Sequence, residues 1–146
     1  MSIALLSIFL TVVVGMAIAT QTLFAGVLGH HVGVMESVFI IHLGGLVAAG
    51  AYLLVLGGGN LGAWKAVPWY VLLFGGLLGV IIVGGYAFVI PRIGLAPAIT
   101  LAVSSQLILS AVISHFGALG AVHQPITISR VIGILVLLLG TWLIVR

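Results

Sequence analysis

Five long runs of apolar residues follow one another along the chain, separated by short stretches rich in glycine, proline and polar residues. Each run is close to the length of about 20 residues that an α-helix needs to cross the hydrocarbon core of a bilayer. Turns are expected at Gly29–Gly33, Gly57–Gly62, Pro91–Gly94 and Gly117–Gln124, where breaking residues gather. The pattern predicts transmembrane helices over residues 3–26, 34–56, 69–89, 95–116 and 126–145. We therefore predict an all-α integral membrane protein whose five helices form one bundle, a single domain over residues 1–146.

Composition supports this class and excludes most others. Hydrophobic residues make up 64% of the 146 residues and charged residues 3%, whereas a soluble domain carries about 25% charged residues. Five spans leave no room for a soluble catalytic domain. The four bases are dispersed rather than clustered, so they do not indicate nucleic-acid binding.

The first apolar run resembles a secretory signal in one respect only. Ala17-Ile18-Ala19 has the small-residue pattern of a signal-peptidase site. A signal also needs a basic segment before its apolar core, and Met1-Ser2-Ile3 supplies no base. We expect residues 3–26 to be retained as a helix.

The few bases give no direction for insertion. With five spans the chain termini lie on opposite sides, which puts Lys65 and Arg130 on one side and Arg92 and Arg146 on the other. Orientation follows the excess of Lys and Arg in cytoplasmic loops, and two against two is no excess. The pattern therefore indicates insertion in both orientations and antiparallel dimers, which are inverted repeats built from two copies of one chain.

Glu36 is the only acid in the sequence. An ionisable residue within a membrane is costly and is usually functional, so this carboxyl group is a candidate for binding a proton or a cation. The same residue also stands in the first turn of the second predicted helix, where the helix dipole favours an acid. Both interpretations are open at this stage.

Polar side chains at membrane depth are the other candidate ligands for a solute. Gln21 and Gln106 are amides that both donate and accept hydrogen bonds, and Ser105 with Ser104 extends the polar segment before Gln106. His42 lies well inside the second predicted helix. It follows Glu36 by six residues, about 240° around a helix, so the two do not share a face. We predict a substrate site lined by Gln21, Glu36, His42, Ser105 and Gln106, with bare interhelical hydrogen bonding as the alternative.

Metal, cofactor and catalytic signals are missing from the sequence. There is no cysteine, which excludes disulfides and thiolate metal sites. His30 and His31 are adjacent in a predicted turn, but neighbouring side chains do not converge on one ion. With a single acid and no nucleophile–base pair, we expect no metal site, no cofactor and no enzyme activity.

Glycines indicate where helices approach closely. Gly75 and Gly79 form a GxxxG pair in the third predicted helix, and Gly44 with Gly45 is expected to act similarly in the second. Gly133 and Gly140 are seven residues apart, which places them on one stripe of the last helix. We expect this stripe to form the dimer interface, with packing inside one chain as the alternative.

Several of these segments together resemble the five-helix YdcZ family of the drug/metabolite transporter superfamily. The resemblance is carried by Val67-Pro68-Trp69, Ile90-Pro91-Arg92-Ile93-Gly94, Gln106-Leu107, His115-Phe116-Gly117 and the Gly133/Gly140 spacing, with Gln21 and Gly44-Gly45 in further agreement. It implies a multi-pass inner-membrane protein that exports small molecules as a dimer. Glu36 is not part of this pattern and rests on the physical argument alone.

The function expected from the sequence is a transporter working by alternating access. Its partners would be the lipid bilayer, a small polar or cationic solute, and a second copy of the chain or a paired homologous subunit. Two alternatives remain: a passive channel for a small ion or solute, and a non-transporting subunit that requires a partner. Flux far above carrier turnover would favour the first alternative.

Overall fold

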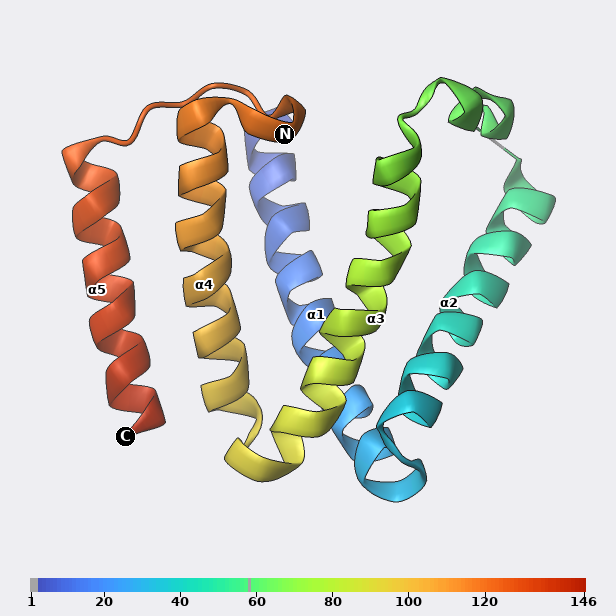
Figure 1. The fold of residues 1–146 in the computed structure, drawn as a ribbon, viewed down its shortest axis with the longest axis horizontal. Helices are drawn as coiled ribbons and strands as arrows, with labels where there is room; N and C mark the ends of the chain where they lie inside the picture. Colours follow the sequence, from blue (N-terminus) through green and yellow to red (C-terminus); the bar gives the residue numbers. More distant parts are fainter. Residues whose placement is uncertain (1–2, 58) are drawn as a thin grey trace. The chain divides into compact units, whose positions relative to one another are not determined.

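The computed structural model describes residues 3–57 and 59–146, and within these ranges the chain is helical without a strand (Figure 1). The α-helices are α1 (Ile3–Val32), α2 (Val34–Leu56), α3 (Trp69–Ile93), α4 (Leu95–Phe116) and α5 (Ile128–Val145). Two short 3-10 helices, η1 (Leu61–Ala66) and η2 (Ala118–Gly120), lie in the connections after α2 and α4.

Among the described residues, five helices are long and apolar enough to cross a membrane. They are α1, α2, α3, α4 and α5, so the prediction of an all-α chain with five spans is confirmed. α2 and α4 have the bounds expected from the sequence.

The predicted end of the first helix was wrong. α1 continues six residues beyond Gly26 to Val32, so His30 and His31 lie in its last turn rather than in a loop. The break comes at Gly33, whose φ of 107° is open to glycine and strained for other residues. Glycines before it do not end the helix, because a backbone in a bilayer has no water to replace a lost hydrogen bond.

The third helix also continues further than predicted. α3 extends past Val89 through Pro91 to Ile93, and the chain turns at Gly94, which has a φ of 86°. Part of the predicted loop at 57–62 is η1, which begins at Leu61; residue 58 of that loop lies outside the described residues. α5 begins at Ile128, two residues after the predicted start.

The helices group into two compact units, one ending at Arg92 and one beginning at Ile93. The first holds α1, α2 and nearly all of α3, and the second holds α4 and α5. The single domain expected from the sequence stays a prediction.

Glycine and serine bring the helices of the first unit together. Ser37 on α2 is completely buried, and its Oγ donates to the carbonyl oxygen of Ala25 on α1 at 3.1 Å. A Cβ added to Gly26 would lie 2.6 Å from Cγ2 of Ile90 on α3, closer than real Cβ contacts. The absence of a side chain at Gly26 therefore sets the distance between α1 and α3.

The glycines predicted to pack helices have a mixed outcome. A Cβ at Gly79 would lie 3.0 Å from Nε2 of His42, so Gly79 does make room for α2. A Cβ at Gly75, Gly44 or Gly45 would meet no atom within 4 Å in the described part of the chain. Among the described glycines on helices, the shortest distances to a neighbouring helix are at Gly26 and Gly29, in the segment where the sequence pattern predicts the end of the helix.

The protein surface has the character expected for contact with lipid. Most large apolar side chains are exposed, including Phe9 on α1, Leu54 on α2 and Leu135 on α5. In the part of the chain that the structure describes, the buried polar side chains are the small residues Thr22, Ser37, Ser104 and Thr141. Hydrophobic side chains on the outside and small hydroxyl groups at helix contacts are the arrangement that a bilayer favours.

Candidate functional site

The connection between α4 and α5 is hydrogen-bonded to the end of α4. Gly117 ends α4 in the left-handed conformation, with its N–H directed at the carbonyl oxygens of Ile113 and Ser114. The N–H of Gln124 donates to the carbonyl oxygen of Ser114 at 2.8 Å, and the N–H of Ile126 donates to Nδ1 of His115 at 3.2 Å. These bonds hold the loop against the end of α4.

The tautomer of His115 follows from this geometry. A nitrogen that accepts a bond from a backbone N–H carries no proton, so the ring proton of neutral His115 is on Nε2. The ring also lies 6.5 Å from the ring of His123, measured between centroids. Both histidines thus lie at the loop end of the α4–α5 pair.

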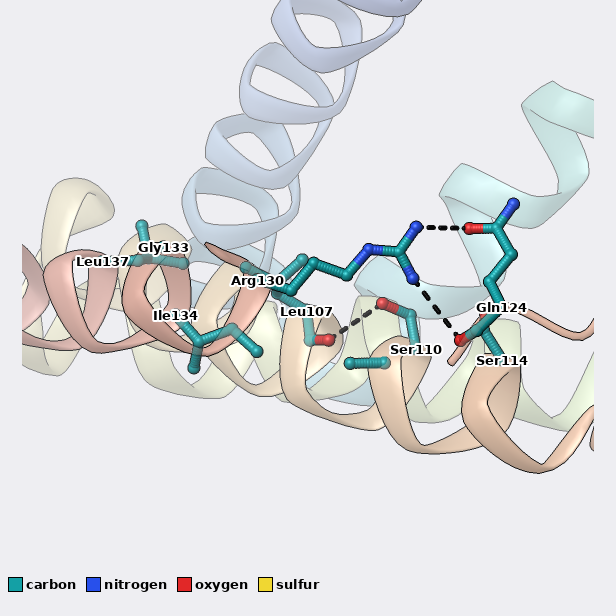
Figure 2. Close-up of a pocket in the computed structure, with 9 residues that line it drawn as sticks. Leu107, Ser110, Ser114, Gln124, Arg130, Gly133, Ile134 and Leu137 are labelled. Atoms are coloured by element: carbon teal, nitrogen blue, oxygen red, sulfur yellow. Dashed lines mark hydrogen bonds between the residues drawn. The ribbon is translucent and has the colours of Figure 1, made fainter. Parts of the chain in front are cut away.

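A groove of about 590 Å³ lies between α4 and α5 (Figure 2). Its lining divides into a polar and an apolar part. Ser110, Ser114, Gln124 and Arg130 are polar, and Leu107, Ala111, Gly133, Ile134 and Leu137 are not. Leu107 and Leu137 lie about two and a half helical turns from the loop ends of their helices. The groove therefore runs from a polar end at the loop to an apolar end nearer the middle of the spans.

Arg130 is the charged residue of this groove. It lies in the first turn of α5, where the helix dipole disfavours a cation. Its side chain reaches back to neutral oxygens. Nη2 donates to Oε1 of Gln124 at 2.7 Å, and Nη1 lies 3.4 Å from the carbonyl oxygen of Gln124 (Figure 2). Nη1 also lies 3.3 Å from the carbonyl oxygen of Pro125. These contacts offset the unfavourable position and direct the guanidinium group toward the loop.

Deeper along the same helix pair, two hydroxyl groups meet. Oγ of Ser104 and Oγ1 of Thr141 are 2.7 Å apart, and both residues are buried. Each hydroxyl also lies within hydrogen-bond distance of a carbonyl oxygen one turn back in its own helix, that of Thr100 for Ser104 and that of Leu137 for Thr141. Because each hydroxyl has one proton, one of the two donates to the other, and the second donates to its own carbonyl oxygen. Ser104 therefore joins the two helices and is not a free ligand for a solute.

Ser105 and Gln106, predicted to line the substrate site, do not line this groove. Both are exposed, and the hydroxyl group of Ser105 donates to the carbonyl oxygen of Ala102 at 2.8 Å. By the helical period, Ser105 is on the opposite side of α4 from Ser114, nine residues further on, and Gln106 is on the flank. Their role in binding a solute stays a prediction.

The other three predicted ligands belong to the first unit. Gln21 on α1 is exposed, as is Glu36 in the first turn of α2. The carboxylate of Glu36 lies over the backbone of Gly33, where a Cβ at that glycine would have been. This position agrees with the interpretation that the acid stabilises the N-terminus of α2.

His42 faces α3. Its Nδ1 lies 2.8 Å from the carbonyl oxygen of Val38, which only accepts, so Nδ1 carries a proton. In the neutral ring the lone pair is then on Nε2, beside Gly79. Because α2 is continuous from Val34 to Leu56, Glu36 and His42 remain on different faces as expected.

The two glycines predicted to form a dimer interface have open space beside them. A Cβ at Gly133 or Gly140 would meet no atom within 4 Å among the described residues. The face of α5 toward α4 centres on Arg130, Ile134, Leu137 and Thr141, and Gly133 lies at its edge, where it lines the groove. The glycine stripe is about a quarter of a turn away from the centre of that face, so its role as an interface stays a prediction.

The groove was not predicted from the sequence, although two signals for it are present. Ser110 and Ser114 are four residues apart in an apolar helix and share a face with Leu107 and Ala111. A base three residues into a helix is also unusual, because the dipole opposes it. The sequence pattern presents Arg130 only as a loop charge that bears on topology. Among the described residues, no group of three or more His, Cys, Asp or Glu side chains lies close enough to hold a metal ion.

Comparison with known proteins assigns the chain to a family, which the geometry of the groove alone does not do. The model of the YdcZ family, described as "Putative inner membrane exporter, YdcZ", matches residues 6–143. The chain belongs to the YdcZ family. Searches of curated proteins and of solved structures each found no match. The resemblance inferred from the sequence is thereby confirmed, and with it a multi-pass location in the inner membrane, which the five spans fit.

Proposed function

We propose that this YdcZ-family chain exports small polar or cationic solutes by alternating access, as a dimer. The observation that carries the proposal is the family match over residues 6–143, which includes at least part of every spanning helix. A membrane exporter of this kind is not an enzyme, and the chain offers a single carboxyl group for any chemistry.

The dimer is supported by the geometry of α5. Gly133 and Gly140 have open space around them, and small residues without a close neighbour allow a second helix to approach. The even division of Lys65 and Arg130 against Arg92 and Arg146 favours two orientations, and therefore an antiparallel pair. A paired homologous subunit is the alternative partner.

The solute site in this proposal comprises Gln21, Glu36, His42, Ser105 and Gln106. Gln21, Glu36, Ser105 and Gln106 are exposed, so their polar groups are accessible. Glu36 is the group that exchanges a proton or a cation for the solute. As the only acid in the chain, it is also the only carboxylate able to attract a cationic substrate.

Uptake into proteoliposomes with an acidic lumen tests proton coupling through Glu36. The wild-type chain should take up solute faster when the lumen is acidic, because protons leaving the lumen drive exchange. Glu36→Gln should keep solute exchange without a pH gradient and lose the stimulation. Lys65→Gln, a change of charge in η1, is the matched control and should keep it. Equal stimulation of wild type and Glu36→Gln would refute the coupling role and leave transport itself intact.

A further inference from the structure

We propose that the groove between α4 and α5 binds an anionic phospholipid, with the headgroup phosphate at Arg130 and an acyl chain along Ala111, Ile134 and Leu137. The proposal does not depend on the transported solute. It rests on the order of groups along the groove and on the charge at its polar end.

The order of groups matches a lipid rather than a soluble anion. The polar lining is at the loop end, where α4 ends at Phe116 and α5 begins at Ile128. The apolar lining extends about two and a half turns toward the middle of the spans. A phospholipid has the same order, with its phosphate at the interface and its acyl chain directed inward. Basic pockets between transmembrane helices bind anionic headgroups in this way.

The charge at the polar end has no acidic side chain in its own unit. Residues 93–146 contain no Asp or Glu, so the partners of Arg130 there are the neutral oxygens of Gln124 and Pro125. A guanidinium group has five N–H donors, and these three contacts do not use them all. Arginine and phosphate also match in geometry, because two parallel N–H groups bind two phosphate oxygens.

Further groups face Arg130 from the elements around it. Ser114 contributes a small hydroxyl residue from the last turn of α4, and Ser110 lies one turn further in. His115 does not line the groove, and its Nδ1 accepts the N–H of Ile126. The hydroxyl group of Ser110 donates to the carbonyl oxygen of Leu107, so the recognition element is one fixed cation beside small neutral side chains.

The test is lipid binding to the purified full chain by native mass spectrometry, with phosphatidylglycerol and phosphatidylcholine of identical acyl chains as probes. Wild type should bind phosphatidylglycerol about fivefold more tightly, the effect of one base near an anionic lipid. Arg130→Gln should abolish the preference, while Arg130→Lys should keep most of it. Lys65→Gln, a base outside the groove, should leave it unchanged. Equal binding of both lipids by wild type, or a preference retained in Arg130→Gln, would overturn the proposal.

Two further arms distinguish a lipid groove from a site for soluble anions and from a contact between two copies of the chain. Ala111→Phe fills the apolar part and should weaken binding of both lipids while Arg130 remains. A thermal melt shows whether this variant folds; Ser110→Leu replaces it if it does not.

The second arm uses wild type only: sn-glycerol 3-phosphate should not displace phosphatidylglycerol. Displacement would identify a site for soluble anions and contradict the proposal. A loss of dimer in Arg130→Gln with unchanged lipid preference would assign the groove to a second copy and also contradict it.

Discussion

The carbonyl oxygen of Ala87 lies 2.7 Å from the position that a Cβ would occupy on Gly29. Pro91 follows Ala87 by four residues in α3 and has no N–H to donate to that carbonyl group. A hydrogen on Cα of Gly29 points at the oxygen instead, in the direction of a weak Cα–H···O contact. The close approach of α1 to α3 thus occurs where proline has removed a helical hydrogen bond.

This relationship predicts the effect of Gly29→Ala. The new methyl group would collide with backbone, which cannot rotate away as a side chain can. We expect a loss of about 1–3 kcal/mol in the free energy of unfolding, as for other overpacked contacts. Unfolding of the purified protein in detergent, followed by circular dichroism against denaturant, measures it.

Gly15→Ala is the matched control on the same helix. A Cβ at Gly15 meets no atom within 4 Å in the described part of the chain, so this change should be neutral or slightly stabilising. Equal stability of the Gly29 and Gly15 variants would show that α1 and α3 do not approach as described.

The buried pair Ser104 and Thr141 predicts a measurable coupling between α4 and α5. Each hydroxyl also has a carbonyl oxygen of its own helix within hydrogen-bond distance, so loss of one partner leaves the other still paired. We expect Ser104→Ala and Thr141→Val to be coupled by about 0.6 kcal/mol, the average for such bonds in a membrane protein. A double-mutant cycle measures this, and strictly additive effects would exclude the bond.

If α5 forms the dimer interface, replacing a glycine on α5 should lower the dimer fraction, and replacing a glycine on α2 should not. Gly140→Leu should reduce the dimer fraction in detergent, because the bulky side chain keeps a second α5 from approaching. Gly44→Leu on α2 is the control, since a Cβ there is equally open. Chemical crosslinking or analytical ultracentrifugation distinguishes them. A dimer fraction unaffected by Gly140→Leu, or equally affected by both changes, would assign the interface elsewhere.

The even charge distribution predicts two orientations in the membrane. Reporter proteins fused to the C-terminus should be active on both sides, because neither side has an excess of bases. Two lysines added near Asn60 should shift the chain to one orientation and reduce transport if antiparallel dimers are required. A reporter active on one side only in the unaltered chain would exclude dual topology.

The sequence predicts the spans well and the contacts poorly, for a physical reason. Hydropathy fixes which segments are in lipid. The glycines that turn chemistry requires flank α2 at Gly33 and Gly57, and α4 at Gly94 and Gly117. Hydropathy does not distinguish a glycine that ends a helix from a glycine at a contact between two helices. The sequence pattern predicts that the first helix ends at Gly26, whereas in the structure Gly26 lies inside α1 and contacts Ile90 on α3. Only the position of Gly26 against Ile90 in the folded chain decides this role.

In the candidate site, too, the sequence predicts which residues are polar and does not predict which of them make contacts. Ser104, Ser105 and Gln106 are consecutive and all polar, but of these three only Ser104 is buried against α5. The groove depends on Gln124 and Arg130, which come together because a loop folds back on α4 through His115 and Ser114. A loop path of this kind has no local pattern that predicts it.

Solute counterflow in proteoliposomes tests transport by alternating access most directly. Vesicles containing the purified chain are loaded with an unlabelled small polar or cationic solute, and entry of the same labelled solute is followed. Alternating access predicts transient accumulation of label above its equilibrium level, an initial rate that saturates with concentration, and loss of both in Gln106→Leu. Entry that rises linearly with concentration without accumulation would identify a channel, and entry no faster than into empty vesicles across a panel of such solutes would contradict transport by this chain alone.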